Sequence, residues 1–209
     1  MKRLSVFLLF SIFFWNSAQA QLGVKGGLNS TVLQGTVGTD ATYQTSYHAG
    51  LFYEMQVLGP VSIQPELLYS LQGTERKSDL VNYRSKLHYL NLPVLAKVTI
   101  GPVYAEAGPQ VGFLLKARED GVMEVGQEGN GEVQISSNDR SSWNDYKKLD
   151  VGFAVGAGLN LPLGFAVGAR FNAGLSDINN VKSVQGVNDP QLKNRVFQVY
   201  ASFQLPNGR

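Results

Sequence analysis

The stretch from Lys147 to Leu175, KKLDVGFAVGAGLNLPLGFAVGARFNAGL, decides the fold of this chain. It reads as two β-strands joined at Pro162-Leu163, because large apolar residues alternate with small or polar residues along each half. The second face consists mostly of glycine and alanine, with isolated charges. A soluble sheet would turn its apolar face inward and place charged residues outside. The hairpin therefore favours a crowded barrel interior, with an ordinary soluble antiparallel sheet as the alternative.

The first 20 residues have the features of a secretory signal peptide. Lys2-Arg3 precedes an apolar run from Leu4 to Trp15, and Ala18-Gln19-Ala20 matches an A-x-A cleavage site. We expect cleavage after Ala20 and a single domain over residues 21–209. No later segment has the apolar length of a spanning helix. An exported chain of this kind can be periplasmic, secreted or an outer-membrane barrel.

Composition and motifs exclude several kinds of chemistry. The absence of cysteine excludes disulfides, thiolate metal sites and a lipoprotein anchor. Without the two basic residues of the signal, 16 basic and 16 acidic residues remain, which argues against a nucleic-acid partner. His48 and His88 lack metal-ligand spacing, and no G-x-S-x-G or H-E-x-x-H motif occurs. We expect no cofactor, no metal and no catalytic residue.

Period-two alternation continues along the rest of the chain and predicts eight strands in total. Besides the two strands of the hairpin they are Gln21–Leu33, Tyr43–Val57, Val61–Gln72, Ser85–Thr99, Val103–Lys116 and Lys193–Leu205.

The predicted connections alternate between short and long. The turns at Leu58–Pro60, Ile100–Pro102 and Pro162–Leu163 are minimal, and the loops near residues 31–42, 74–84, 117–146 and 177–192 are long. Short turns at one rim and long loops at the other are typical of outer-membrane barrels. We predict an all-β fold, an eight-stranded antiparallel up-and-down transmembrane β-barrel with short periplasmic turns and long extracellular loops.

Five segments carry a resemblance to a known family. They are GVKGGLN (Gly23–Asn29), IQPELLYSLQG (Ile63–Gly73), LHYLNLPVLAKV (Leu87–Val98), GPQVGFLL (Gly108–Leu115) and DVGFAVGAGLNL (Asp150–Leu161). In these segments the chain resembles the outer-membrane β-barrel proteins of Bacteroidetes, the porin-family or PorT-like proteins. The resemblance implies a location in the bacterial outer membrane. One departure is that Phe203 is followed by Gln204–Arg209, whereas such barrels usually end on an aromatic residue.

Charged residues occur at positions that a membrane barrel turns inward. Alternation places Lys25, Glu54, Glu66, Glu106 and Arg170 there, and the strand register implied by the resemblance adds Lys97. The set has three charges of each sign, and unpaired charges in a low-dielectric lumen are costly. We predict a charge-balanced network that fills the lumen, because eight strands leave room only for side chains.

Pro65, Pro93 and Pro109 lie inside predicted strands, where each lacks the N–H that a strand ladder needs. We expect bulges, or strand ends near a rim, at these positions.

These observations predict a non-enzymatic integral outer-membrane protein, with a scaffold, surface-binding or narrow-passage role. Its partners would be outer-membrane lipid and, through the outer loops, other envelope or secretion proteins; we expect a monomer. The PorT-like resemblance implies a secretion-accessory role. Two alternatives stay open: a lipid-modifying enzyme that uses His48 with Ser46 or Glu54, and a soluble lipocalin-like periplasmic binder with its apolar faces inside.

Overall fold

The computed structural model describes residues 20–35, 43–78, 81–125, 134–141, 146–178 and 192–205. The predicted signal peptide lies outside these ranges apart from Ala20. Within them the strands are β1 (Ala20–Gly35), β2 (Gln44–Leu58), β3 (Val61–Ser78), β4 (Val81–Ile100), β5 (Val103–Val125), β6 (Gln134–Ser141), β7 (Leu149–Asn160), β8 (Phe165–Gly174) and β9 (Leu192–Gln204).

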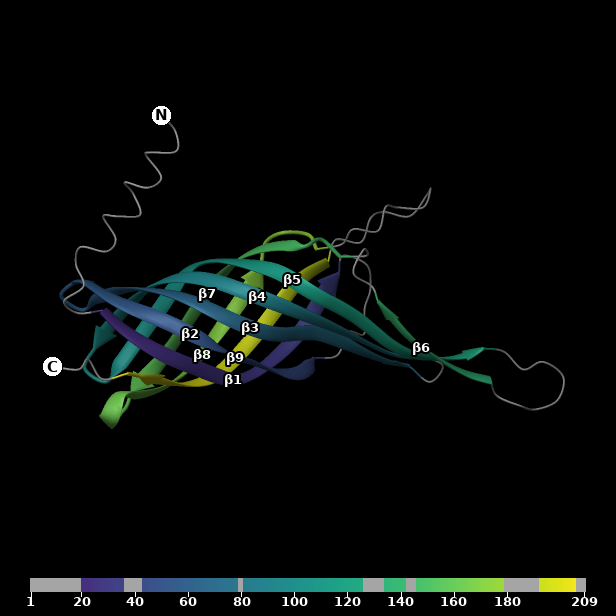
Figure 1. The fold of residues 1–209 in the computed structure, drawn as a ribbon, viewed down its shortest axis with the longest axis horizontal. Coiled ribbons are helices and arrows are strands. Elements are labelled where there is room, and N and C mark those ends of the chain that lie inside the picture. The colour runs from purple at the N-terminus through teal and green to yellow at the C-terminus, as the bar shows by residue number, and fades with distance from the viewer. Residues whose placement is uncertain are drawn as a thin grey trace, which may run out of the picture.

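Eight of these strands form a closed antiparallel barrel (Figure 1). Each strand pairs with its neighbours in the order β1-β2-β3-β4-β5-β7-β8-β9, and β9 pairs with β1 to close the ring. β6 is not part of the ring, since within the described residues it pairs only with the outer end of β5. The predicted fold class is therefore confirmed.

Three short turns connect strands at one rim, as the connection lengths predict. Gly59 and Gly101 hold positive φ angles of 53° and 59° at the first two turns, a conformation that glycine adopts without a Cβ penalty. A 3-10 turn at Pro162–Gly164 forms the third. We call this end of the barrel the turn rim.

At the opposite rim three strands are longer than predicted. Within the segment 74–84, predicted to be a loop, residues 74–78 and 81–84 instead pair as continuations of β3 and β4, and β5 runs on to Val125. Outside a membrane these strand ends need no apolar face, so the alternation that marks a strand is lost there. Register places Glu75 opposite Arg84. We call residues 74–78, 81–84 and 118–125 together with β6 the outer extension, which projects beyond the barrel in Figure 1.

The three prolines lie within strands that keep their register, so the expectation of bulges or rim positions was wrong. The pairs that would oppose Pro65 to Tyr53, Pro93 to Glu66 and Pro109 to Val94 are missing from the ladders. The pairs on both sides of each gap follow one register. Each proline therefore removes rungs of the ladder without shifting the strand.

The apolar faces of the strands point outward around the barrel wall. On β7 and β8 the exposed large side chains include Val151, Phe153, Val155, Leu159, Phe165, Val167 and Phe171. A soluble barrel would bury these residues, so this arrangement contradicts the lipocalin-like alternative. Among the described residues, no helix combines the length and apolar character needed to cross a membrane.

Candidate functional site

Four charged side chains and a tyrosine meet at the centre of the lumen. Arg170 on β8 donates from Nη1 to Glu66 Oε2 at 2.7 Å and from Nη2 to Glu66 Oε1 at 2.8 Å. Its Nε donates to Glu106 Oε1 at 2.8 Å. Lys25 Nζ donates to Glu66 Oε1 at 2.6 Å, and Tyr200 Oη to Glu106 Oε1 at 2.7 Å. We call these five residues the central cluster.

The central cluster is isolated from solvent and neutral in formal charge. Each of its charged residues is less than 5% exposed, with two positive and two negative groups in all. Removing one partner of such a buried ion pair leaves an uncompensated charge, which is far more costly than losing a surface pair. The members come from β1, β3, β5, β8 and β9, so the cluster ties distant parts of the wall together.

A second tyrosine, Tyr104, extends the central cluster through its contact with Tyr200. Tyr104 and Tyr200 share a hydrogen bond of 2.9 Å between their hydroxyl groups. Lys25 Nζ lies 4.1 Å from the centroid of the Tyr200 ring, a cation–π contact. A Cβ on Gly168 would lie 2.6 Å from both hydroxyl oxygens, so the small inward residues make room for these rings.

A second ion pair lies nearer the turn rim. Lys97 Nζ donates to Glu54 Oε2 at 2.8 Å, and Ser62 Oγ donates to Glu54 Oε1 at 2.8 Å. This pair lines a cavity of about 490 Å³, bordered by Gly59 and Pro60 at the rim and by Glu106 of the central cluster. The half of the lumen toward the turn rim is therefore hollow and polar, so the prediction that side chains fill the lumen was wrong for this half, and the central cluster forms its inner end.

A network of neutral polar residues lies on the other side of the central cluster. Asn29 Nδ2 donates to Ser70 Oγ at 3.1 Å, and Gln198 Nε2 donates to Asn29 Oδ1 at 2.9 Å. His48 Nδ1 is 2.7 Å from the same Asn29 oxygen. All four side chains are buried.

Apolar side chains fill the mouth of the barrel beneath the outer extension. The buried residues in contact there are Leu87, Tyr89, Leu114, Ala117, Tyr146 and Ile178. The backbone of Lys147 donates to the Ile178 carbonyl at 2.8 Å, and the backbone of Leu114 donates to the Lys148 carbonyl at 2.8 Å. These bonds link the segment at Lys147 and Lys148 both to Ile178 and to β5 at the mouth of the barrel.

The structure places all six charged residues named from the sequence inside the barrel, in two separate groups. Lys25, Glu66, Glu106 and Arg170 lie together, while Lys97 and Glu54 form their own pair. Sequence reasoning missed the polar partners Tyr104, Tyr200, Asn29 and Gln198. Their alternation with apolar residues marks an inward position, but Tyr104 and Tyr200 also suited an interfacial aromatic role.

The residues considered for catalysis do not come together. The Nδ1 atom of buried His48 contacts Asn29, while Ser46 Oγ donates to the Leu71 carbonyl at 2.6 Å. His88 is on the outer surface, where its Nδ1 is 2.5 Å from the Tyr69 hydroxyl. Among the described residues, no group of three or more His, Asp or Glu side chains is arranged to hold a metal ion.

Comparison with solved structures finds similar chains at low sequence identity. Neisserial surface protein A has a TM-score of 0.50 at 8% identity, with 90% of this chain and 99% of that chain covered. Ail, the attachment invasion locus protein of Yersinia pestis, has a TM-score of 0.48 at 13% identity, with coverages of 90% and 99%. OprG from Pseudomonas aeruginosa has a TM-score of 0.43 at 12% identity, with coverages of 89% and 96%. At such low identity the likeness concerns the fold alone.

Among curated proteins, none matches the chain in sequence. Residues 16–180 match the family described as "Outer membrane protein beta-barrel domain". That match spans more than half of the chain and agrees with the closed barrel and its outward apolar faces. The chain therefore belongs to the Outer membrane protein beta-barrel domain family, whose members are barrels of the bacterial outer membrane.

Proposed function

We propose that this chain is a non-enzymatic outer-membrane protein whose barrel, blocked at its centre, holds the outer extension above the membrane as a binding surface. The observation that carries the proposal is the length of β5, which has 23 residues. A strand needs only about 9–11 residues to cross the membrane. The additional residues at the outer ends of β3, β4 and β5 form a four-stranded sheet with β6 outside the barrel.

The block at the centre of the lumen argues against a transport pore. A solute that entered the cavity at the turn rim would meet the central cluster, in which Arg170 links Glu66 and Glu106. Beyond it lie the neutral polar network and the apolar residues at the mouth. The barrel is therefore suited to anchoring, and its distinctive outer feature is the extension.

The edges of the outer extension are suited to a polypeptide partner. β6 pairs on one side only, with β5, and residues 74–78 of β3 pair only with β4 in the described part of the chain. Such edges offer backbone N–H and C=O groups to which an extended segment of another protein can add as a strand. The partner would be another envelope protein or, in line with the PorT-like resemblance, a component of a secretion apparatus.

The proposal is tested by shortening the extension. An Asn-Gly turn would replace residues 75–84, and a second would replace 119–140, at positions where register brings the remaining ends together. The shortened protein should still reach the outer membrane and show a mobility shift on boiling in a gel assay. A photo-crosslinker at Ser137 in β6 should capture a discrete partner in intact cells, and one at Leu163 in the turn rim should not. Equal capture at both positions would contradict the proposal.

A narrow passage is the second candidate, favoured by the cavity of about 490 Å³ at the turn rim. Planar-bilayer conductance recordings distinguish the narrow passage from the binding-surface function. The barrel should show no steady conductance, and Lys97→Ala should not open a passage because the central cluster remains in place. Steady conductance of the unmodified protein would favour the passage.

A further inference from the structure

One carboxylate oxygen inside the barrel lacks a hydrogen-bond donor. Both oxygens of Glu66 and both oxygens of Glu54 accept hydrogen bonds from neighbouring side chains. By contrast, the bonds that Arg170 and Tyr200 donate to Glu106 both end on Oε1. The Oε2 atom of Glu106 is buried and accepts no hydrogen bond from the described residues. A buried charged acceptor without a donor is costly, so this oxygen is suited to a hydrogen bond from a bound molecule.

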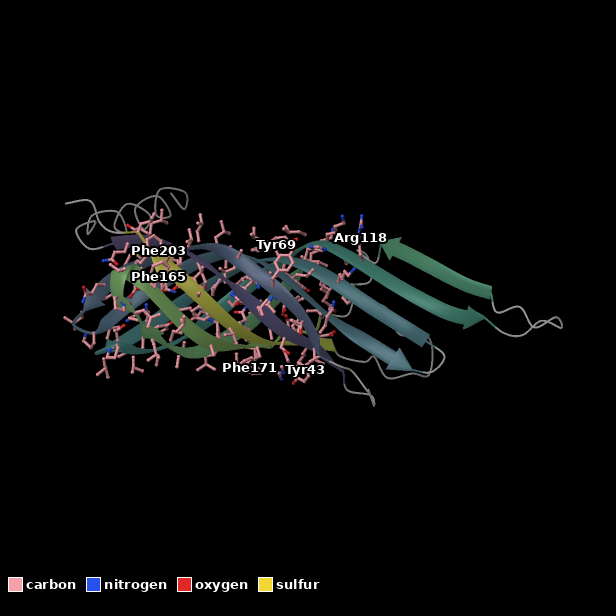
Figure 2. All side chains as sticks on the ribbon, turned by 90° about the horizontal axis from the view of Figure 1, so that it is seen from below. Tyr43, Tyr69, Arg118, Phe165, Phe171 and Phe203 are labelled. Carbon is pink, nitrogen blue, oxygen red and sulfur yellow. The ribbon has the colours of Figure 1, made fainter. Side chains whose placement is uncertain are left out.

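The cavity in the half of the lumen toward the turn rim has room for such a molecule. Glu106 borders the cavity on the side of the central cluster, and Gly59 and Gly164 border it at the turn rim. Figure 2 shows Phe165, which also borders the cavity, at the end of the barrel away from the outer extension. The volume of about 490 Å³ lies within the range of about 300–1,000 Å³ that small-molecule sites occupy. A single water molecule, at about 30 Å³, would fill little of it.

The charges around the cavity favour a neutral ligand. Lys25, Lys97, Glu54 and Glu106 border the cavity, so the two signs balance. Lys25 is already paired with Glu66, and Lys97 with Glu54. A ligand with a net charge would enter this enclosed site without a free counter-charge, which is costly. A neutral molecule that donates a hydroxyl group to Oε2 of Glu106 would satisfy the acceptor and keep the charges balanced.

Neutral side chains with both donors and acceptors make up much of the remaining wall of the cavity. The amide residues that border it are Gln21, Gln56, Gln64, Asn160 and Gln204. An amide both donates and accepts hydrogen bonds, and so does each hydroxyl group of a polyhydroxylated ligand. We propose that the cavity binds a neutral sugar of one or two rings, with one sugar hydroxyl donating to Oε2 of Glu106. The site lies away from the outer extension, so this inference goes beyond the proposed binding surface and does not depend on it.

The experiment uses the full barrel in phosphatidylcholine nanodiscs, because this lipid headgroup carries no sugar. Glucose, mannose, sucrose and trehalose are the neutral probes, and glucosamine and glucuronate are charged counterparts of glucose. At least one neutral sugar should shift the NMR amide signals of Ala166 and Ser202, which border the cavity, more than the signal of Val155 in the wall. The charged probes should bind about tenfold more weakly than the best neutral sugar, since each brings an uncompensated charge into the site.

Two variants test the site itself. Glu106→Gln should weaken binding of the same sugar about tenfold, because the charged acceptor is lost. Since that variant also changes the central cluster, Ala166→Leu is the second test: it fills the cavity from β8, keeps every member of the central cluster and should abolish binding. Val167→Leu is the matched control on the same strand, with its side chain exposed on the outer wall, and should bind like the unmodified protein.

The sugar site and the proposed outer binding surface can fail separately, because removal of the outer extension should leave sugar binding unchanged. No response at Ala166 and Ser202 to any of the four neutral sugars would overturn the sugar site, since the cavity would then hold only water. Tighter binding of glucosamine or glucuronate would overturn it as well, because the cavity would then select for charge. Undiminished binding by Ala166→Leu would place the sugar outside the cavity and contradict the proposal.

Discussion

Arg170 and Glu66 join opposite walls of the barrel through two hydrogen bonds of 2.7 and 2.8 Å. They lie on β8 and β3, four places apart in a ring of eight strands. Both side chains are fully buried. The pair therefore spans the lumen, and the stability of the barrel depends on it more than on any exposed ion pair.

Replacing Arg170 with methionine should lower the free energy of unfolding by about 3–5 kcal/mol, because a buried ion pair would lose one partner. Glu66 and Glu106 would then share Lys25 as their only cation in the central cluster. Urea unfolding in lipid vesicles, followed by the gel shift between folded and unfolded barrel, measures the effect. Arg170→Lys keeps the charge but loses the bidentate contact with Glu66, so its free energy of unfolding should lie between those of the unmodified protein and Arg170→Met. A urea midpoint unchanged by Arg170→Met would show that the pair does not stabilise the barrel.

Arginine at Val155 should be poorly tolerated, because this side chain is 52% exposed near the middle of β7 and faces lipid. At the bilayer midplane arginine costs about 2–4 kcal/mol, and near an interface about 0–1 kcal/mol. Leu58→Arg, at the turn rim where the side chain is 78% exposed, is the matched control. The same unfolding assay compares them. Equal stability of the two variants would place Val155 outside the hydrocarbon region.

Alternation along single strands predicted the strands and the inward position of residues such as Glu66 and Arg170, because a period of two fixes the face of each side chain. The prediction of a barrel also needed the regular exchange of short turns and long loops. It does not fix which inward residues meet. Arg170 and Glu66 are 104 residues apart in sequence. Their contact depends on strand stagger around the closed ring, a property of all eight strands together.

The sequence was least informative where the membrane no longer imposes a pattern. Residues 74–78 and 81–84 pair as strands, yet the polar composition of this segment reads as a loop since neither face must be apolar in water. A bulge at Leu115 of β5, where Tyr89 of β4 pairs with Leu114 and His88 pairs with Lys116, could not be predicted for a different reason. The run Leu114-Leu115-Lys116-Ala117 contains no glycine or proline to mark an irregular position, and only the pairing with β4 shows it.

Replacing Ile178 with alanine should loosen the mouth of the barrel. Ile178 is fully buried among apolar side chains, and its carbonyl accepts a hydrogen bond from the backbone of Lys147. Truncation of a buried isoleucine to alanine costs about 2–5 kcal/mol. Hydrogen exchange at the Lys147 amide should accelerate, while the Val155 amide in the wall stays protected. Leu175→Ala, at an exposed position of the same segment, is the control. Unchanged exchange at Lys147 would show that Ile178 does not hold the segment.

Gly168 offers a test of how the lumen is packed. A Cβ at this position would lie 2.6 Å from the hydroxyl oxygens of Tyr104 and Tyr200. Gly168→Ala should therefore force the tyrosine pair apart and disturb the bond from Tyr200 to Glu106. Overpacking of this kind costs about 1–3 kcal/mol. Urea unfolding of the variant measures that cost.

Two further comparisons separate the cost of overpacking from any general cost of placing alanine in a strand. Gly26→Ala should be nearly neutral, because its Cβ would meet only the His48 carbonyl oxygen at an ordinary 3.7 Å. In a Tyr104→Leu, Tyr200→Leu background, Gly168→Ala should cost less than in the unmodified protein, since the shortened side chains no longer reach the new Cβ. Contacting residues show such coupling in double-mutant cycles. If Gly168→Ala cost the same in both backgrounds, the glycine would serve the strand backbone and not the tyrosine pair.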